Sequence, residues 1–252
     1  MANKTYILDV QVLQDCIKDT NHFLKVVNNE KISYLVVDND GYYSRNQWSP
    51  WFYERGINIP EDRFYTSTMA SIDTVVHEYP QKKKAAYIGS NSLKEALIRG
   101  GFTIDQELVD WVFVGFDKEA GFPDYQHLLK CVNAGAKIIC TDSRASVTTS
   151  KETYIGPKAV ATMLETAGNT KALSYCCPSV VFFQCVKNYL EINSEDMILV
   201  SNQLSTMILA AKQASVETIF LPSNNEEITN SDIQPDYVAN GLLGVTASID
   251  RD

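Results

Sequence analysis

The chain has 252 residues, of which 45% are hydrophobic and 21% are charged, as in an ordinary globular protein. Its formal net charge of −9 would repel a phosphodiester backbone, and the basic run Lys82–Lys84 is too short for a nucleic-acid footprint, so we expect no nucleic-acid partner. No stretch is apolar and long enough to span a bilayer, and the N-terminus lacks the apolar segment of a secretory signal; these features predict no membrane association and a cytoplasmic location.

Short apolar runs rich in β-branched and aromatic residues alternate with longer helical patterns along the chain. In chain order we expect strand 6–10, helix 20–28, strand 32–38, helices 44–55 and 67–78, strand 85–89, helix 93–99, strand 111–115, helix 125–133, strand 137–140, helices 157–167 and 178–191, strand 197–200, helix 204–214 and strand 218–221. A polar stretch at 223–234 indicates a surface loop. The alternation of strands and helices predicts an α/β fold with parallel βαβ units.

Polar residues follow several of the predicted strands at the point where each strand ends. They are Asp9, Asp38 to Asp40, the pair Cys176 and Cys177, and Ser201 with Asn202. In open parallel sheets ligands gather at the carboxyl ends of the strands, so chemistry is expected at these positions. The six cysteines lie in strand-like or helix-like contexts typical of reduced, buried thiols. The adjacent pair could be redox-active or bind a soft metal, but without a nearby His it is better explained as small residues filling a turn.

Four runs of sequence carry a resemblance to a known family. They are GINIPEDRFYTSTM at 56–69, AAYIGSNSLKEALIRGGFTI at 85–104, WVFVGFDKEAGFPDYQHLLKCVNAGAKIICTD at 111–142 and MILVSNQLSTMILAAKQASVETIFL at 197–221. In order and spacing they resemble the NagD-like haloacid dehalogenase (HAD) phosphatases of subfamily IIA, over nearly the whole chain. The resemblance implies a Rossmann-like HAD core with a parallel sheet, formed by 1–79 and 154–252, and an inserted α/β cap domain of the C2 type at 80–153.

The first two motifs of that family match this chain only in part. The family hydrolyses phosphate monoesters with an aspartate nucleophile and Mg²⁺, and its first motif, DxDGT, also supplies an acid/base aspartate. Here Asp9 stands at the nucleophile position, whereas Gln11 replaces the acid/base; its amide cannot transfer a proton, although its backbone carbonyl could ligand a metal. The second motif holds the phosphate with Thr or Ser followed by asparagine. Its place is taken by Asp38 and Asn39, and the Asp38 carboxylate would repel a phosphate.

The last two motifs have lost their charged residues. The lysine of the third motif falls on Cys177, and a neutral thiol cannot offset the charge of a phosphate. The Mg²⁺-binding carboxylates of the fourth motif fall on Asn202 and Met207, which leaves Asp9, Gln11 and Asn202 as a degenerate metal set. Of the charged residues that the family uses in its four motifs, only Asp9 remains.

The resemblance therefore implies a NagD-like phosphatase homologue that has lost phosphohydrolase activity and binds a small phosphorylated metabolite or a protein partner. We expect no cofactor, or Mg²⁺ if activity remains. The alternative is a weak or altered Mg²⁺-dependent hydrolase that acts on a small phosphorylated metabolite with Asp9 as nucleophile. A third hypothesis is a homo-oligomer that assembles through the cap.

Two further alternatives stay open at the level of sequence. The run LVVDNDGYY at 35–43 itself has the form of a strand followed by DxDG and could be the first motif, although it would leave the segment before it unexplained. Alternatively, Asp9, Asp38 and Asp40 converge at adjacent strand ends and hold a cation between them.

Overall fold

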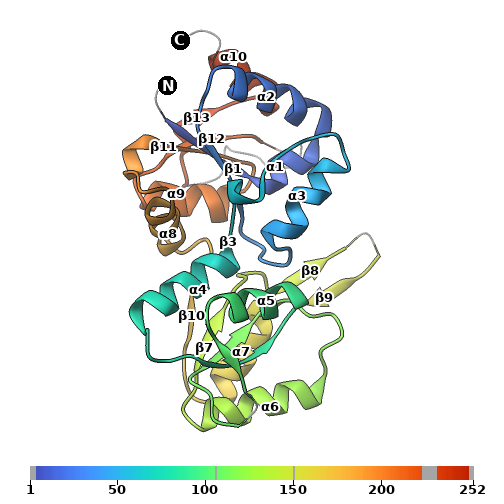
Figure 1. The fold of residues 1–252 in the computed structure, drawn as a ribbon, viewed down its shortest axis with the longest axis vertical. Coiled ribbons are helices and arrows are strands. Elements are labelled where there is room, and N and C mark those ends of the chain that lie inside the picture. Colours follow the sequence, from blue (N-terminus) through green and yellow to red (C-terminus); the bar gives the residue numbers. More distant parts are fainter. Residues whose placement is uncertain (1–3, 106, 150, 223–231, 250–252) are drawn as a thin grey trace. The chain divides into compact units, whose positions relative to one another are not determined.

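A computed structural model describes residues 4–105, 107–149, 151–222 and 232–249 (Figure 1). The chain forms two compact units. Unit 1 consists of Met1–Asp38, Arg45–Tyr65 and Val180–Asp252, and unit 2 consists of Asn39–Ser44 and Thr66–Ser179. Within the described ranges, no helix combines the length and the apolar character that crossing a bilayer requires.

Unit 1 is built on a six-stranded sheet in the order β13-β12-β11-β1-β2-β3. The strands are β1 (Thr5–Asp9), β2 (Tyr34–Asp38), β3 (Phe64–Thr66), β11 (Met197–Ser201), β12 (Glu217–Phe220) and β13 (Tyr237–Val238). β1 pairs in parallel with β2 on one side and with β11 on the other. Helices cover both faces of such a sheet, so its central strands are mostly apolar. Every residue of β1, β2 and β11 except Thr5 is buried.

The helices of unit 1 position the ends of these strands. They are α1 (Val10–Asp15), α2 (Ile17–Asn29), α3 (Arg45–Tyr53), α8 (Val181–Leu190), a π-helical turn η3 (Leu204–Ile208), α9 (Leu209–Gln213) and α10 (Gly241–Ile249), with short turns η1 (Glu61–Arg63) and η2 (Ser194–Asp196). α2 and α10 lie side by side (Figure 1). Alternate residues of the strands, such as Tyr6, Leu8 and Val36, pack with Phe23 and Phe52 from α2 and α3 in one apolar core.

Unit 2 is built on a five-stranded parallel sheet in the order β10-β7-β6-β4-β5. Its strands are β4 (Lys84–Ile88), β5 (Thr103–Ile104), β6 (Trp111–Val114), β7 (Lys137–Cys140) and β10 (Ala172–Ser174), and β8 (Ser146–Thr148) pairs antiparallel with β9 (Thr153–Ile155). Its helices are α4 (Ser67–Glu78), α5 (Asn91–Arg99), α6 (Phe122–Asn133) and α7 (Pro157–Ala167). α6 and α7 pack on one face of the sheet, where they bury Val112, Val114 and Ile138.

The predicted α/β fold with parallel sheets is confirmed, and most predicted elements lie within a few residues of the observed ones. Helices 67–78 and 157–167 have the bounds expected from the sequence. The region after β1 differs: Val10 was expected in a strand, but it opens helix α1, because the Asp9 side chain caps that helix. Residues 223–231 of the predicted loop 223–234 lie outside the described residues.

The units divide the chain differently from the expected domains 1–79 plus 154–252 and 80–153. β10 joins the sheet of unit 2 by pairing with β7, and α7 packs on the same sheet, so the segment up to Ser179 goes with unit 2. Short strands such as β10, which is only partly buried, carry little periodic signal in the sequence. The expected domain boundaries stay a prediction.

Candidate functional site

Asp9 ends the central strand of unit 1, and its carboxylate is fully buried. Its Oδ1 accepts a hydrogen bond from the backbone N–H of Gln11 at 3.0 Å. Its Oδ2 accepts from the Ser201 hydroxyl at 2.6 Å and from the Gln203 side-chain amide at 3.1 Å. Ser201 is itself oriented, because its Oγ accepts from the backbone N–H of Gln203. These three donors, which come from the predicted first and fourth motifs, are uncharged.

Asn202, the other fourth-motif position, turns to a different carboxylate. Its Nδ2 donates to Oδ2 of Asp15, at the end of α1, over 2.8 Å. Burial raises the pKa of Asp15 above its ordinary value, and the hydrogen bond from Asn202 partly offsets that effect. The expected metal position thus acts as a hydrogen-bond donor.

Asp38 follows Asp9 on the neighbouring strand, since β1 and β2 align Asp9 with Val37. Its side chain is buried, and Oδ2 accepts a hydrogen bond of 2.8 Å from the indole N–H of Trp48 in α3. A buried carboxylate must be paired or hydrogen-bonded to be tolerated, and the indole supplies part of that requirement. The carboxylate at the start of the second motif therefore has a structural partner within unit 1.

Asn39 and Cys177, two of the predicted site residues, lie together in unit 2. The backbone N–H of Cys177 donates to Asn39 Oδ1 at 2.7 Å, and Asn39 Nδ2 lies 3.4 Å from the Cys177 carbonyl oxygen. Both residues are buried. The Asn39 amide thus binds the backbone of the third-motif turn, so the residue expected to bind substrate is used to join two motifs.

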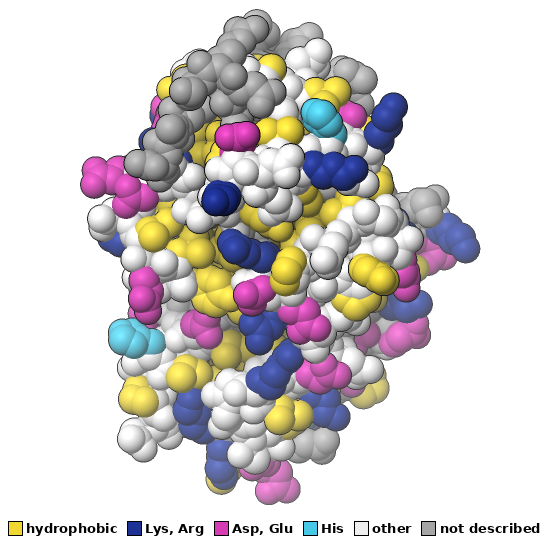
Figure 2. Space-filling view, turned by 45° about the horizontal axis from the view of Figure 1, so that its top comes forward, with side chains coloured by type: hydrophobic (Ala, Val, Ile, Leu, Met, Phe, Trp, Pro, Cys, Tyr) yellow, Lys and Arg dark blue, Asp and Glu magenta, His cyan; other side chains and the backbone are white. Residues whose placement is uncertain are grey.

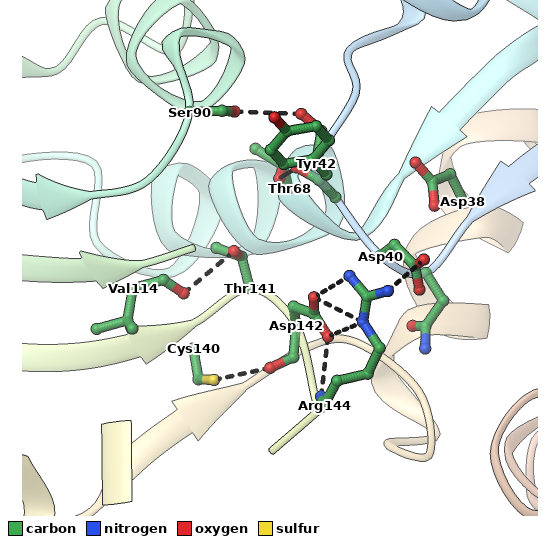
Figure 3. Close-up of polar contacts among 12 residues, drawn as sticks. Asp38, Asp40, Tyr42, Thr68, Ser90, Val114, Cys140, Thr141, Asp142 and Arg144 are labelled. Atoms are coloured by element: carbon green, nitrogen blue, oxygen red, sulfur yellow. Dashed lines mark hydrogen bonds and ion pairs between the residues drawn. The ribbon is translucent and has the colours of Figure 1, made fainter. Parts of the chain in front are cut away.

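An ion-pair network that the sequence did not predict lies after β7 in unit 2. Asp142 is buried, and its Oδ2 accepts hydrogen bonds from Arg144 Nε at 3.0 Å and from Arg144 Nη2 at 2.6 Å. Arg144 Nη1 reaches Oδ2 of Asp40 at 2.7 Å (Figure 3). Burial raises the pKa of Asp142, and the arginine counteracts that rise. Asp142 and Arg144 lie within four residues of the carboxyl end of β7, where ligand-binding residues gather in parallel sheets. That position in the sequence is the signal that could have revealed this network.

The buried thiols of unit 2 have the properties of inert side chains. Burial raises the pKa of Cys140 to about 12 and that of Cys176 to about 11. Cys140 Sγ donates to the backbone oxygen of Asp142, and Cys176 Sγ lies 3.0 Å from the Ser174 hydroxyl. The reactive form of a cysteine is the thiolate, which these environments disfavour. For Cys176, this agrees with the interpretation of the cysteine pair as structural.

The donor set at the first and fourth motifs fits Mg²⁺ poorly. Mg²⁺ takes oxygen ligands in octahedral geometry, whereas Ser201, Asn202 and Gln203 present O–H or N–H groups to carboxylates. In the part of the chain that the structure describes, no group of three or more His, Cys, Asp and Glu side chains is placed to hold a metal ion. The hypothesis that Asp9, Asp38 and Asp40 share a cation stays a prediction.

On the face seen in Figure 2, Lys and Arg side chains are interspersed with Asp and Glu rather than gathered in one patch. That face offers no basic stripe of the kind that follows a nucleic-acid backbone.

The two parallel sheets define an α/β protein, and comparison with known proteins agrees with this class. A family model described as haloacid dehalogenase-like hydrolase matches residues 10–103. The ribonucleotide monophosphatase NagD of Escherichia coli (strain K12) is 29% identical over 184 residues, which cover 73% of this chain and 72% of that protein. An acid sugar phosphatase of Staphylococcus saprophyticus is 22% identical and covers 98% of each chain.

Solved structures agree on the fold. NagD from E. coli superimposes with a TM-score of 0.86 at 24% identity, covering 96% of this chain and 98% of NagD. A 4-nitrophenylphosphatase from Thermotoga maritima gives a TM-score of 0.88 at 17% identity, covering 97% and 96%. The fold is that of a NagD-like core with a C2 cap. In sequence, the chain is similar to HAD-like hydrolases such as NagD.

Proposed function

We propose that this NagD-type phosphatase homologue binds a phosphorylated small molecule or a protein partner without hydrolysing it. One observation carries the proposal: neutral donors from the fourth motif, Ser201 and Gln203, hydrogen-bond directly to the Asp9 carboxylate. In the family that the chain resembles, carboxylates of the fourth motif would face the same region and need a cation between them. Here hydroxyl and amide dipoles satisfy Asp9 without one.

The chemistry of phosphate-monoester cleavage supports the same conclusion. The leaving oxygen needs a proton, which Gln11 cannot give, and positioned acid/base groups typically contribute 10²–10⁴-fold to rate. The attacking carboxylate should be free to form the acyl phosphate, but Asp9 is buried and accepts three hydrogen bonds. Cys177 supplies no charge to the phosphoryl group. Losses of this kind do not multiply simply, yet together they leave little rate.

The comparisons, taken alone, favour the second candidate, a weak or altered phosphatase with Asp9 as nucleophile. The relatives are named ribonucleotide monophosphatase, acid sugar phosphatase and dihydroxyacetone phosphatase, and nothing in those names indicates lost activity. Under this candidate, Mg²⁺ would bind at Asp9 and a small phosphorylated metabolite would be the substrate.

Turnover measured against a matched variant separates the two candidates. Wild type and Asp9→Asn are purified in parallel and assayed with p-nitrophenyl phosphate, a ribonucleoside 5′-monophosphate and a hexose phosphate, with and without Mg²⁺. Since any contaminating phosphatase is present in both preparations, the proposal predicts equal rates. A Mg²⁺-dependent rate that Asp9→Asn abolishes would establish the hydrolase instead.

Restoring the lost groups tests the reasoning from the other direction. The triple variant Gln11→Asp, Cys177→Lys and Asn202→Asp returns the acid/base, the phosphate-binding cation and one metal carboxylate. We expect it to bind Mg²⁺ in calorimetry and wild type not to. The added substitution Asp9→Asn serves as the control that any recovered turnover must lose.

Partner and assembly are separate parts of the proposal. Titration with inorganic phosphate and with the same monophosphates, followed by intrinsic fluorescence, tests for a small ligand. Light scattering coupled to size exclusion tests the homo-oligomer, for which we expect a mass above the 28.2 kDa of one chain.

A further inference from the structure

The loop Asn39–Ser44 crosses the carboxyl ends of four strands of the unit 2 sheet. In that sheet β4 lies between β5 and β6. The next strand in the chain after β4 is β5, on one side of it, whereas β6 lies on its other side and is followed outward by β7 and β10. The carboxyl ends of β4 and β6 therefore form the point where the strand order reverses. Open parallel sheets take their ligands at such a point. Here the chain's own loop lies across it.

The first half of the loop contacts the outer strand ends. Asn39 exchanges hydrogen bonds with the backbone of Cys177, three residues past β10. Asp40, next along the loop, pairs with Arg144, four residues past β7. The spatial order of these contacts, β10 and then β7, follows the order of the residues along the loop.

The second half of the loop continues in the same order. The Tyr42 ring lies 5.5 Å from the ring of Phe116, two residues past β6, and the Tyr42 carbonyl accepts a hydrogen bond from Ser90, two residues past β4 (Figure 3). Between these halves, Gly41 lies against α4, where the Thr68 hydroxyl donates to its carbonyl oxygen. All these contacts lie within unit 2.

One of these contacts differs from the others in its chemistry. Arg144 is fixed from behind, because the buried Asp142 holds Nε and Nη2 and also accepts its backbone N–H at 2.8 Å. The remaining nitrogen, Nη1, points to Asp40, and the two side chains are 33% and 24% exposed. A bidentate carboxylate orients an arginine fork, and a hydrogen bond between charged groups is about twice as strong as a neutral one.

We infer that Arg144 is the residue that positions this loop. The loop so positioned covers the point in the unit 2 sheet where a ligand would otherwise bind. Asp142 orients Arg144, Arg144 holds Asp40, and the loop so placed presents Asn39 to the third-motif turn. The inference does not rest on the function proposed above, because it concerns the loop and applies with or without hydrolysis.

Hydrogen exchange read by mass spectrometry on the full chain tests it. We compare wild type, Asp40→Ala, Arg144→Gln and the double variant, with Lys94→Gln as the control, since Lys94 is an exposed cation of the same unit. Asp40→Ala leaves the Arg144 fork on Asp142 intact. We expect the amides of 39–44 to exchange at least about tenfold faster in either single variant, the size of effect that loss of a hydrogen bond between charged groups produces.

The pattern of exchange separates positioning from general stability. In Asp40→Ala, we expect the amides of β6 and β7 to keep their wild-type exchange rates. In the double variant, the loop amides should exchange no faster than in Arg144→Gln alone. Arg144→Lys should recover part of the protection of the loop amides. Loop rates in Asp40→Ala within about twofold of wild type would overturn the inference. Faster exchange spread evenly over unit 2 in Asp40→Ala would overturn it as well.

Discussion

The substitution Asp9→Asn distinguishes a structural carboxylate from a catalytic one, because the two roles predict opposite effects on stability. A residue kept for reaction is often held at a cost to stability, so replacing it is commonly neutral or stabilising. Asp9 is buried, caps α1 and accepts hydrogen bonds on both oxygens. We therefore expect the amide to destabilise unit 1.

The size of the effect follows from counting donors and acceptors. An asparagine keeps one acceptor oxygen and replaces the other with an NH₂ group. If the oxygen faces Ser201 and Gln203, the NH₂ faces the Gln11 N–H; if it faces Gln11, the NH₂ faces the two side-chain donors. At least one donor loses its partner in either case, which costs about 1–3 kcal/mol. For a chain of this length, a loss of about 2 kcal/mol lowers Tm by about 4–8 °C.

Guanidinium denaturation of wild type and Asp9→Asn, each with and without Mg²⁺, measures the difference. Asp62→Asn is the control, because Asp62 is an exposed aspartate of the same unit. We expect Asp9→Asn to lose stability, Asp62→Asn to stay within about 0.5 kcal/mol of wild type, and Mg²⁺ to change neither. An Asp9→Asn protein as stable as wild type, or a wild type stabilised by Mg²⁺, would refute the reasoning.

Three further predictions concern a glycine, a carboxylate and the thiols. Gly41 has φ of +63°, and an added Cβ would lie 2.6 and 2.7 Å from two buried hydroxyl oxygens of α4. Urea denaturation of Gly41→Ala should therefore show a free energy of unfolding lower by more than about 1 kcal/mol. Gly101→Ala, where φ is +82° and no atom lies within 4 Å of the added Cβ, should lose less stability. Burial raises the pKa of Asp15 in the folded state above its unfolded value, so the wild type loses stability as the pH rises through the interval between the two values. The stability of Asp15→Asn relative to wild type should therefore grow from pH 3.5 to pH 7. A constant difference in stability would contradict the pKa shift. Ellman's reagent should label the exposed Cys16 in the native protein and reach Cys140, whose pKa is raised to about 12, only on unfolding; rapid native labelling of Cys140 would contradict its burial.

Sequence patterns predicted the regular parts of the fold and failed where tertiary contacts decide. Helix α7 was predicted to the residue, since a proline opens it and Gly168 follows its end. Helix α1 was missed because it is only six residues long and follows a buried strand without a break, so the apolar run continues from one element into the next. Strand β10 was missed because three partly buried residues give no period.

The candidate site divides in the same way. Motif positions can be read along the chain, and on that basis Asp9, Gln11 and Cys177 are predicted as site residues. Their partners could not be assigned, since Ser201 lies 192 residues from Asp9 in the chain, and the pairing of Arg144 with Asp40 spans 104 residues. A hydrogen bond over such a separation depends on which distant segments become neighbours in the fold, and a local sequence pattern does not specify that.

Under the proposed function, the residues at the predicted first and fourth motifs depend on one another. A buried carboxylate such as Asp9 must be compensated, and in a Mg²⁺ enzyme the cation would compensate it together with any carboxylate opposite. With Ser201 and Gln203 as donors, Asp9 is satisfied without a cation. Returning one carboxylate alone, as in Asn202→Asp, would place a charge beside Asp15 in place of the donor that Asp15 now has. We therefore expect Asn202→Asp to be less stable than wild type without Mg²⁺ and to regain stability as Mg²⁺ is added. A variant as stable as wild type in the absence of Mg²⁺ would show that the two motifs are independent.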